Sequence, residues 1–191
     1  MTLFYFHGFN SDGHGWKFQA LRKQFKTFKV FGPDLPAAPL QVMAEMTAIV
    51  EKAAPPYYFI GTSLGGFYAY CFSAKYNSPC FLFNPSIRPH QTLHRGIGSH
   101  TTFTKGRPYV FVEPYLHDLA RLKAMADGTI KPEHLNFFLA TNDDVLDLSP
   151  IPELFPRSNF LDWYDQVGHG FSAFREVLPT VERLINQYQS D

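Results

Sequence analysis

Short, almost continuously apolar runs alternate along this chain with stretches whose apolar residues recur at helical spacing. Strand-length runs occur at residues 2–6 (TLFYF), 28–31 (FKVF), 57–60 (YYFI), 80–83 (CFLF), 136–140 (NFFLA) and 159–163 (NFLDW). Helical patterns lie between them, at residues 16–26, 40–53, 64–75, 117–126 and 174–188. Strands that are apolar on both sides are typical of a parallel sheet buried between two helical layers. We therefore predict a three-layer α/β fold with a mostly parallel, six-stranded sheet and helices on both faces.

One long segment interrupts this alternation. The chain has 191 residues, which suits a single domain spanning residues 1–191. Residues 90–134, however, are long for a connection and rich in Gly, Pro and His. Long insertions of this kind often cover a binding site, so we predict a short lid-like insertion there. Pro179 is predicted to kink or restart the last helix.

The charge balance narrows the class of binding partner. Lys and Arg together number 17, as do Asp and Glu, so the formal net charge is zero. A chain without an excess of one charge has no field to attract nucleic acid or an anionic membrane. The opening residues also lack a basic region followed by a long apolar one. We expect a cytoplasmic protein that binds neither nucleic acid nor membranes, and its oligomeric state stays open.

Cysteine and histidine spacing gives no support for a metal or a disulfide framework. Cys71 and Cys80 both lie in apolar runs and are expected to be buried free thiols. His117 and His134 have no second pair of ligands at metal-binding spacing. We expect neither a metal nor any other cofactor.

The strongest chemical signal is YYFIGTSLGGFYAY, in which a strand runs through Gly61-Thr-Ser-Leu-Gly65 directly into a helix. This is the G-x-S-x-G nucleophile elbow in the strand–turn–helix setting that the motif requires. A purely structural glycine-rich turn is the alternative. The glycines permit a tight, strained turn that lifts the Ser63 hydroxyl out of the sheet. Ser63 is therefore the candidate nucleophile.

A second element, FHGFN, follows the first strand. Acyl transfer places negative charge on the carbonyl oxygen, and two backbone N–H groups usually receive it. We expect one donor from Leu64, after the nucleophile, and the other from Phe9, in the loop after the first strand. Gly8 lets that loop approach closely, and His7 is better explained as a turn-stabilising residue than as a catalytic one.

The serine needs a base, and the base needs an acid to orient it. Among eight histidines, only His169 lies between the last strand and the last helix, where the order Ser, Asp/Glu, His places the base. The acid is expected at the end of the fifth strand, where Asp143 is favoured and Asp144 is the runner-up. Asp147 is better explained as a helix cap. Asn84 or Arg88, after the fourth strand, could shape the pocket, and capping or a surface ion pair explains them equally well.

The motifs FYFHGFNS, GTSLGGFYAY, FNPSIRP, TNDDVLD and VGHGF together resemble the YqiA/YcfP family of small bacterial α/β-hydrolase esterases, and more closely its YqiA-like branch. The resemblance runs almost end to end. It implies an α/β-hydrolase fold without the first two strands of the larger fold, with strand order 2-1-3-4-5-6. It implies cofactor-free hydrolysis of carboxylic esters or acyl thioesters, with Ser63 as nucleophile, Asp143 as acid and His169 as base. Asn142 and Val167 stand where glycine is common in this family.

The predicted function is thus a serine esterase that acts on a small acyl ester or thioester through a Ser-His-Asp triad and an acyl-enzyme intermediate. Two alternatives use the same fold. One is an amidase or peptidase with the same triad, and the other is a binding protein without catalysis.

Overall fold

The computed structural model describes residues 1–190, so the last residue of the predicted 1–191 domain lies outside the described part. Its centre is one six-stranded sheet with the order β2-β1-β3-β4-β7-β8. The strands are β1 (Thr2–Phe6), β2 (Lys29–Phe31), β3 (Tyr57–Thr62), β4 (Cys80–Phe83), β7 (Leu135–Ala140) and β8 (Phe160–Tyr164). All five pairings are parallel. The predicted sheet and its 2-1-3-4-5-6 order are therefore confirmed.

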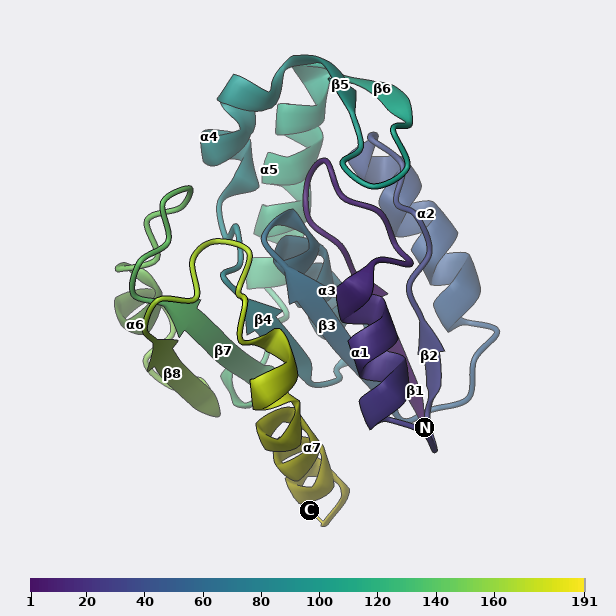
Figure 1. Cartoon of the computed structure of the whole chain (residues 1–191), viewed down its shortest axis with the longest axis vertical. Coiled ribbons are helices and arrows are strands. Elements are labelled where there is room, and N and C mark those ends of the chain that lie inside the picture. The colour runs from purple at the N-terminus through teal and green to yellow at the C-terminus, as the bar shows by residue number, and fades with distance from the viewer. Residues whose placement is uncertain (191) are drawn as a thin grey trace.

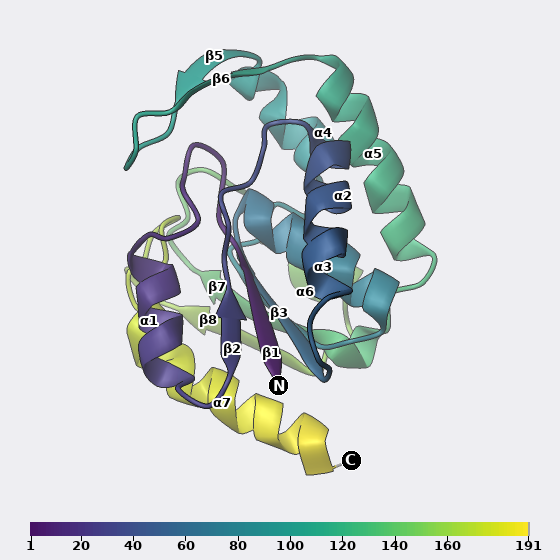
Figure 2. The ribbon, with the colours of Figure 1, turned by 90° about the vertical axis from the view of Figure 1, so that its right-hand side faces the viewer.

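Helices cover both faces of this sheet, as predicted. The helices are α1 (Trp16–Gln24), α2 (Pro39–Val50), α3 (Leu64–Tyr76), α4 (Pro89–Thr92), α5 (Pro114–Asp127), α6 (Ile151–Leu154) and α7 (Phe174–Ser190). Figure 2 shows α1 and α7 on one side of the sheet and α2 and α3 on the other, with α5 packed outside them. The two layers explain why the strands are apolar on both sides.

Each face of the sheet has its own hydrophobic core. Alternate residues of β1 divide between the two, because successive side chains of a strand point to opposite faces. Phe4 and Phe6 pack with the side of α2, α3 and α5, whereas Leu3 and Tyr5 pack with the side of α1 and α7. The many phenylalanines of the sequence thus fill these cores.

The segment between β4 and β7 contains structure that the sequence patterns do not predict. After α4 and a short 3-10 helix (Leu93–Gly96), β5 (Gly98–Thr101) and β6 (Pro108–Phe111) pair antiparallel as a separate hairpin. Helix α5 and a second 3-10 helix (Pro132–His134) then lead back to the sheet. Figure 1 shows the hairpin above the carboxyl ends of the central strands.

Helix α7 passes through Pro179 without a break. Pro179 has no N–H to donate to the Arg175 carbonyl, so the helix lacks this one hydrogen bond but continues on both sides of it. The predicted restart at Pro179 is therefore wrong. Among residues 1–190, no helix combines the length and apolar character needed to cross a membrane.

Candidate active site

The turn between β3 and α3 holds Ser63 in a strained conformation. Its φ of 54° and ψ of −123° lie where non-glycine residues are rare. The two flanking glycines are required by contact: a Cβ on Gly61 would lie 2.1 Å from the Gly65 carbonyl oxygen, and one on Gly65 would lie 2.0 Å from that of Phe6. The Ser63 amide donates to the Phe83 carbonyl at 3.0 Å, which fixes the turn against β4.

The loop between β8 and α7 brings His169 to this serine. The distance from His169 Nε2 to Ser63 Oγ is 2.9 Å, although the two residues are 106 positions apart. The side-chain amide of Asn84 donates to the carbonyls of Gly168 and His169, at 2.9 and 3.0 Å. Asn142, after β7, accepts from the Gly168 amide at 3.0 Å. Hydrogen bonds from the ends of two neighbouring strands, β4 and β7, therefore hold the backbone on either side of the imidazole.

Asp143 lies on the other side of the imidazole. His169 Nδ1 is 2.8 Å from one oxygen of Asp143 and 3.0 Å from the other. The amides of Val145 and Leu146 donate to the same carboxylate, whose side chain is only 2% exposed. Burial raises the pKa of Asp143, but the hydrogen bonds from His169 and the two amides outweigh it, so the pKa lies below its ordinary value.

The other acidic candidates lie apart from the imidazole. The Asp144 side chain is exposed and makes no hydrogen bond or ion pair with residues 1–190. Asp147 accepts from the amide and hydroxyl of Ser149, whereas α6 has Pro150 at its N-cap. Asp147 therefore forms a local turn and does not cap a helix, contrary to the expectation from Leu-Ser-Pro. Arg88 is exposed and lines neither the groove nor the cavity described below.

The loop after β1 passes directly beside Ser63. A Cβ on Gly8 would lie 3.3 Å from the Ser63 Cβ, so this loop contacts the serine. No acceptor within residues 1–190 takes the amide of Phe9. Leu64 is the first residue of α3, where the N–H has no acceptor inside the helix. Two amides without an acceptor among residues 1–190 thus lie beside Ser63.

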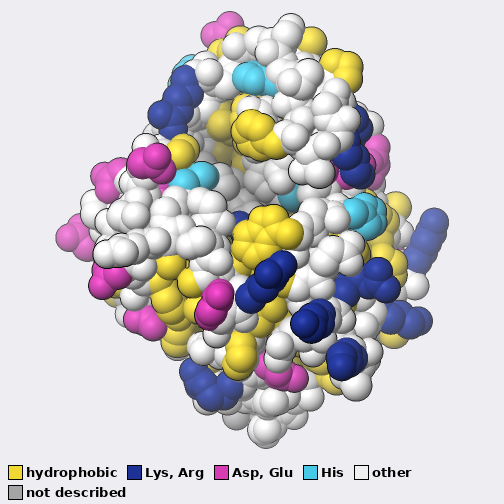
Figure 3. Space-filling view, viewed as in Figure 1, with side chains coloured by type: hydrophobic (Ala, Val, Ile, Leu, Met, Phe, Trp, Pro, Cys, Tyr) yellow, Lys and Arg dark blue, Asp and Glu magenta, His cyan; other side chains and the backbone are white. Residues whose placement is uncertain are grey.

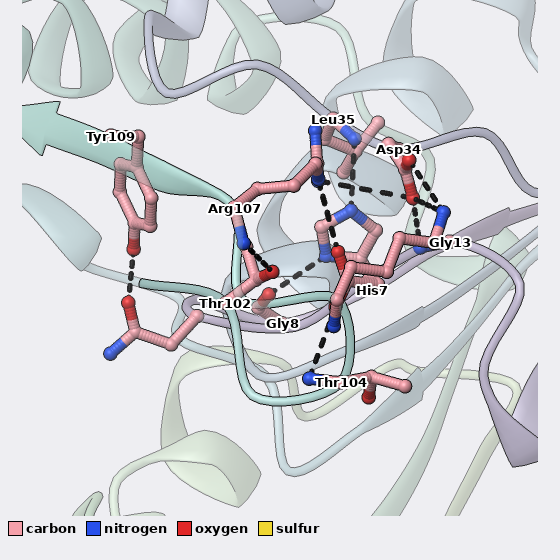
Figure 4. A network of polar contacts seen from close by, with 12 residues as sticks. His7, Gly8, Gly13, Asp34, Leu35, Thr102, Thr104, Arg107 and Tyr109 are labelled. Carbon is pink, nitrogen blue, oxygen red and sulfur yellow. Dashed lines mark hydrogen bonds and ion pairs between the residues drawn. The ribbon is translucent and has the colours of Figure 1, made fainter. Parts of the chain in front are cut away.

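His7 stabilises the loop, as predicted for a turn residue. Its Nε2 accepts from the Leu35 amide at 2.9 Å, which leaves Nδ1 to donate to the Gly8 carbonyl at 2.9 Å (Figure 4). Burial is the main cause of its lowered pKa, so the ring is neutral and joins the loop after β1 to the loop after β2.

Two hollows meet at Gly8 and Phe9. One is an open groove lined by Ser63, His169, Trp16 and Phe103, among others, and Figure 3 shows the hollowed face between the hairpin and the sheet. The other is a cavity of about 120 Å³ bordered by both Phe9 and Leu64, with Leu35, Tyr68 and Phe111 in its wall. Ser63 and His169 therefore lie in an open groove that adjoins a small, mainly apolar cavity.

Sequence reasoning found the triad candidates but missed the support that Asn142 gives to the His169 loop, and it left the role of Asn84 open. The available signal was position, because each asparagine directly follows a strand that neighbours the elbow or the histidine loop. Within residues 1–190, no group of three or more His, Cys, Asp or Glu side chains could hold a metal ion.

Comparison with known proteins places this chain in a family. The model of a family described as "Uncharacterised protein family (UPF0227)" matches residues 2–186. This match confirms the resemblance to the YqiA/YcfP family that the motifs indicate.

Solved structures show the same α/β-hydrolase fold at low sequence identity. Est1E from Butyrivibrio proteoclasticus, solved with ferulic acid bound, has a TM-score of 0.77 at 12% identity, covering 100% of this chain and 90% of its own. A monoacylglycerol lipase from Paleococcus ferrophilus has a TM-score of 0.70 at 12% identity, with coverages of 97% and 94%. The methylesterase MES16 from Arabidopsis has a TM-score of 0.60 at 18% identity, with coverages of 100% and 99%.

Proposed function

We propose that this chain, which belongs to the uncharacterised protein family UPF0227, is a serine esterase that hydrolyses small carboxylic esters or acyl thioesters. One observation carries the proposal: an unbroken series of contacts from the Ser63 hydroxyl through His169 to Asp143, with 2.9 and 2.8 Å separations. The nucleophile, base and orienting acid of acyl transfer require this arrangement. The structural neighbours include a monoacylglycerol lipase and a methylesterase, which supports the same chemistry.

The first half of the proposed reaction acylates the serine. Ser63 Oγ attacks the substrate carbonyl while its proton passes to His169 Nε2. The ionised Asp143 stabilises the resulting imidazolium and keeps the Nδ1 proton directed toward itself. The amides of Phe9 and Leu64 donate to the oxyanion, and its collapse expels the alcohol or thiol, which takes the proton from His169.

The second half reverses these roles with water. His169 Nε2 accepts a proton from the water as its oxygen attacks the acyl-enzyme carbonyl, and the same two amides hold the second oxyanion. The collapse releases the carboxylic acid and returns the proton to Ser63 Oγ. No step needs a cofactor.

The two hollows suggest how a substrate lies in the site. The leaving group must be close to His169 to receive its proton, which places it in the groove shared by His169 and Ser63. The acyl part then extends past the two amides into the apolar cavity. A monoacylglycerol lipase and a methylesterase are among the structural neighbours, and both names fit esters of small alcohols.

The test compares wild type, Ser63→Ala and a matched control, Ser190→Ala, which removes an exposed serine at the C-terminal end of α7 whose hydroxyl donates only to the Asn186 carbonyl. We expect wild type and Ser190→Ala to hydrolyse p-nitrophenyl butyrate or butyryl thioesters, and Ser63→Ala to lose the activity while keeping its circular dichroism spectrum. An anilide of the same acid separates an amidase from an esterase. If the wild type cleaves none of the three substrates, the binding-protein alternative replaces the esterase.

A further inference from the structure

Three sets of contacts join the loop after β1 to the β5–β6 hairpin, although about 90 residues separate the two segments in sequence. The first is the ring of Phe9, which is nearly perpendicular to the rings of His100, Tyr109 and Phe111, at centroid distances of 5.1, 5.9 and 5.5 Å. Edge-to-face packing of this kind fixes the orientation of a ring. The hairpin therefore holds the side chain of a residue whose amide borders Ser63.

The second set of contacts is at Asn10, the next residue. Its carbonyl accepts from the Phe103 amide at 2.8 Å, and its side-chain oxygen accepts from the Tyr109 hydroxyl. Asn10 has a φ of 59°, in the left-handed region that residues other than glycine seldom occupy. Contacts with the hairpin thus hold the backbone in an unusual turn directly after the Phe9 amide.

The third set of contacts is at the carboxylate of Asp12. One oxygen accepts from the amides of Thr104 and Lys105, at 3.3 and 3.0 Å, and the other accepts from the Arg107 guanidinium at 3.2 and 3.1 Å. The Asp12 side chain is 1% exposed, whereas that of Arg107 is 42% exposed. A buried carboxylate with four charge-assisted bonds is a strong and geometrically specific anchor.

The same cluster continues to the loop after β2. Asp34 accepts from the Gly13 amide at 2.8 Å and from the Lys105 ammonium at 2.7 Å, and it lies 3.8 Å from Arg107 (Figure 4). Burial raises the pKa of Asp12, but the hydrogen bonds from the Lys105 amide, the Arg107 guanidinium and the Thr104 amide outweigh it, so the pKa is lowered and the carboxylate is ionised at neutral pH.

We propose that the hairpin is a fixed brace for the oxyanion donor Phe9 and that Asp12 is the positioning residue that locks it. This inference rests on the proposed function, because it concerns an amide that acts only during acyl transfer. It assigns the predicted lid-like insertion, residues 90–134, a different task. To open as a lid, the hairpin would have to break the Phe9, Asn10 and Asp12 contacts together and release the amide from its place.

The brace predicts a specific kinetic signature. A donor that is displaced from the oxyanion weakens the transition state, while substrate binding in the groove is preserved. Complete loss of one donor lowers turnover by about 10²–10³-fold, so a displaced donor is expected to lower kcat by about 10- to 100-fold. KM should change by less than about threefold on the same reasoning.

The experiment uses Asp12→Asn, which keeps the shape of the side chain but presents an amide group to N–H donors. Tyr109→Phe is a milder second variant that removes only the hydroxyl on Asn10. The matched control is Asp127→Asn, a carboxylate of the same insertion that pairs with Lys123 on α5. Each variant is measured for kcat and KM, and for inhibition by a trifluoromethyl ketone and by the corresponding methyl ketone.

A trifluoromethyl ketone forms an oxyanion with the serine, whereas the methyl ketone binds largely without reacting. We expect Asp12→Asn to weaken trifluoromethyl ketone inhibition in parallel with kcat/KM and to leave methyl ketone inhibition unchanged. Tyr109→Phe should show a smaller loss of trifluoromethyl ketone inhibition and of kcat/KM. Asp127→Asn should behave like wild type. If Asp12→Asn keeps the wild-type kcat and the wild-type ratio of trifluoromethyl ketone to methyl ketone inhibition, the proposed brace is overturned. If Asp12→Asn does not fold, the same result in Tyr109→Phe overturns it. If wild type itself hydrolyses no ester, the proposed function fails first and the brace fails with it.

Discussion

Replacing Asn84 by aspartate tests whether this buried side chain holds the His169 loop. Asn84 is 0% exposed, and its amide nitrogen donates to two carbonyls of that loop, while its oxygen accepts from the Ala140 amide at 2.8 Å. Asn84→Asp keeps the oxygen that accepts from Ala140. The nitrogen, however, becomes an oxygen that faces two carbonyl oxygens at about 3 Å.

The free energy of unfolding of this variant should depend on pH. When protonated, the introduced carboxyl can donate to one carbonyl, so it loses one hydrogen bond, or about 1 kcal/mol. When ionised, it has no donor and is buried, so its pKa in the folded state rises above the unfolded value of about 3.9. A group with a raised folded pKa contributes its full stability below the unfolded pKa and loses it as pH rises toward the folded one. Stability should therefore fall by about 1.4 kcal/mol per pH unit, or about 2–3 kcal/mol from about pH 5 to pH 7.

Urea unfolding at a series of pH values measures this slope. Wild type and Asn84→Ala serve as references, because alanine removes all three partners and introduces no titratable group. Asn84→Ala is expected to be less stable than wild type by several kcal/mol, with a parallel pH profile. If the profile of Asn84→Asp runs parallel to that of wild type over this range, the side chain does not make the contacts with the His169 loop on which this reasoning depends.

Three further predictions concern the triad and its turn. Asp143→Asn should lower kcat by about 10³–10⁴-fold, because the amide no longer fixes the His169 tautomer. Steady-state kinetics on a variant with an unchanged circular dichroism spectrum checks this, and a loss of kcat below about tenfold would contradict it. Gly65→Ala should lose activity and about 1–3 kcal/mol of unfolding free energy, because the new Cβ would lie 2.0 Å from the Phe6 carbonyl, and a wild-type melting temperature would speak against that contact. The pKa values of Asp12 and Asp143 are lowered on folding, so their contribution to stability is present above about pH 4 and is lost as the pH falls further. Denaturant midpoints that stay constant down to about pH 3 would refute this.

The sheet and its covering helices could be predicted because local pattern and final environment agree. The run of residues 57–60 is apolar on both sides and becomes the buried β3. The spacing of Phe18, Leu21 and Phe25 predicts that they share one helical face, and all three are buried. The same spacing predicts that Leu40, Met43, Met46 and Val50 form the buried face of α2. Met46 and Val50 are buried and Met43 is partly buried, but Leu40 is 44% exposed.

The hairpin could not be predicted, because its strands carry little local signal. GSHT is short and polar, and PYVF begins with a proline, so neither reads as a strand. The contacts of Phe9 and Asp12 hold this segment in place across more than 90 residues of sequence. The hydrogen bonds from Asn84 and Asn142 to the His169 loop could not be predicted either, because they join residues far apart in sequence. A single asparagine after a strand also resembles an ordinary turn residue.

Labelling with a fluorophosphonate, followed by peptide mass spectrometry, tests the central claim most directly. The reagent reacts with a serine whose proton a neighbouring base accepts, and it needs no knowledge of the substrate. We predict one label per chain, located on Ser63, and slow or absent labelling in His169→Ala. Absence of a label on Ser63 in the folded wild type, or labelling at the same rate in His169→Ala, would contradict the account.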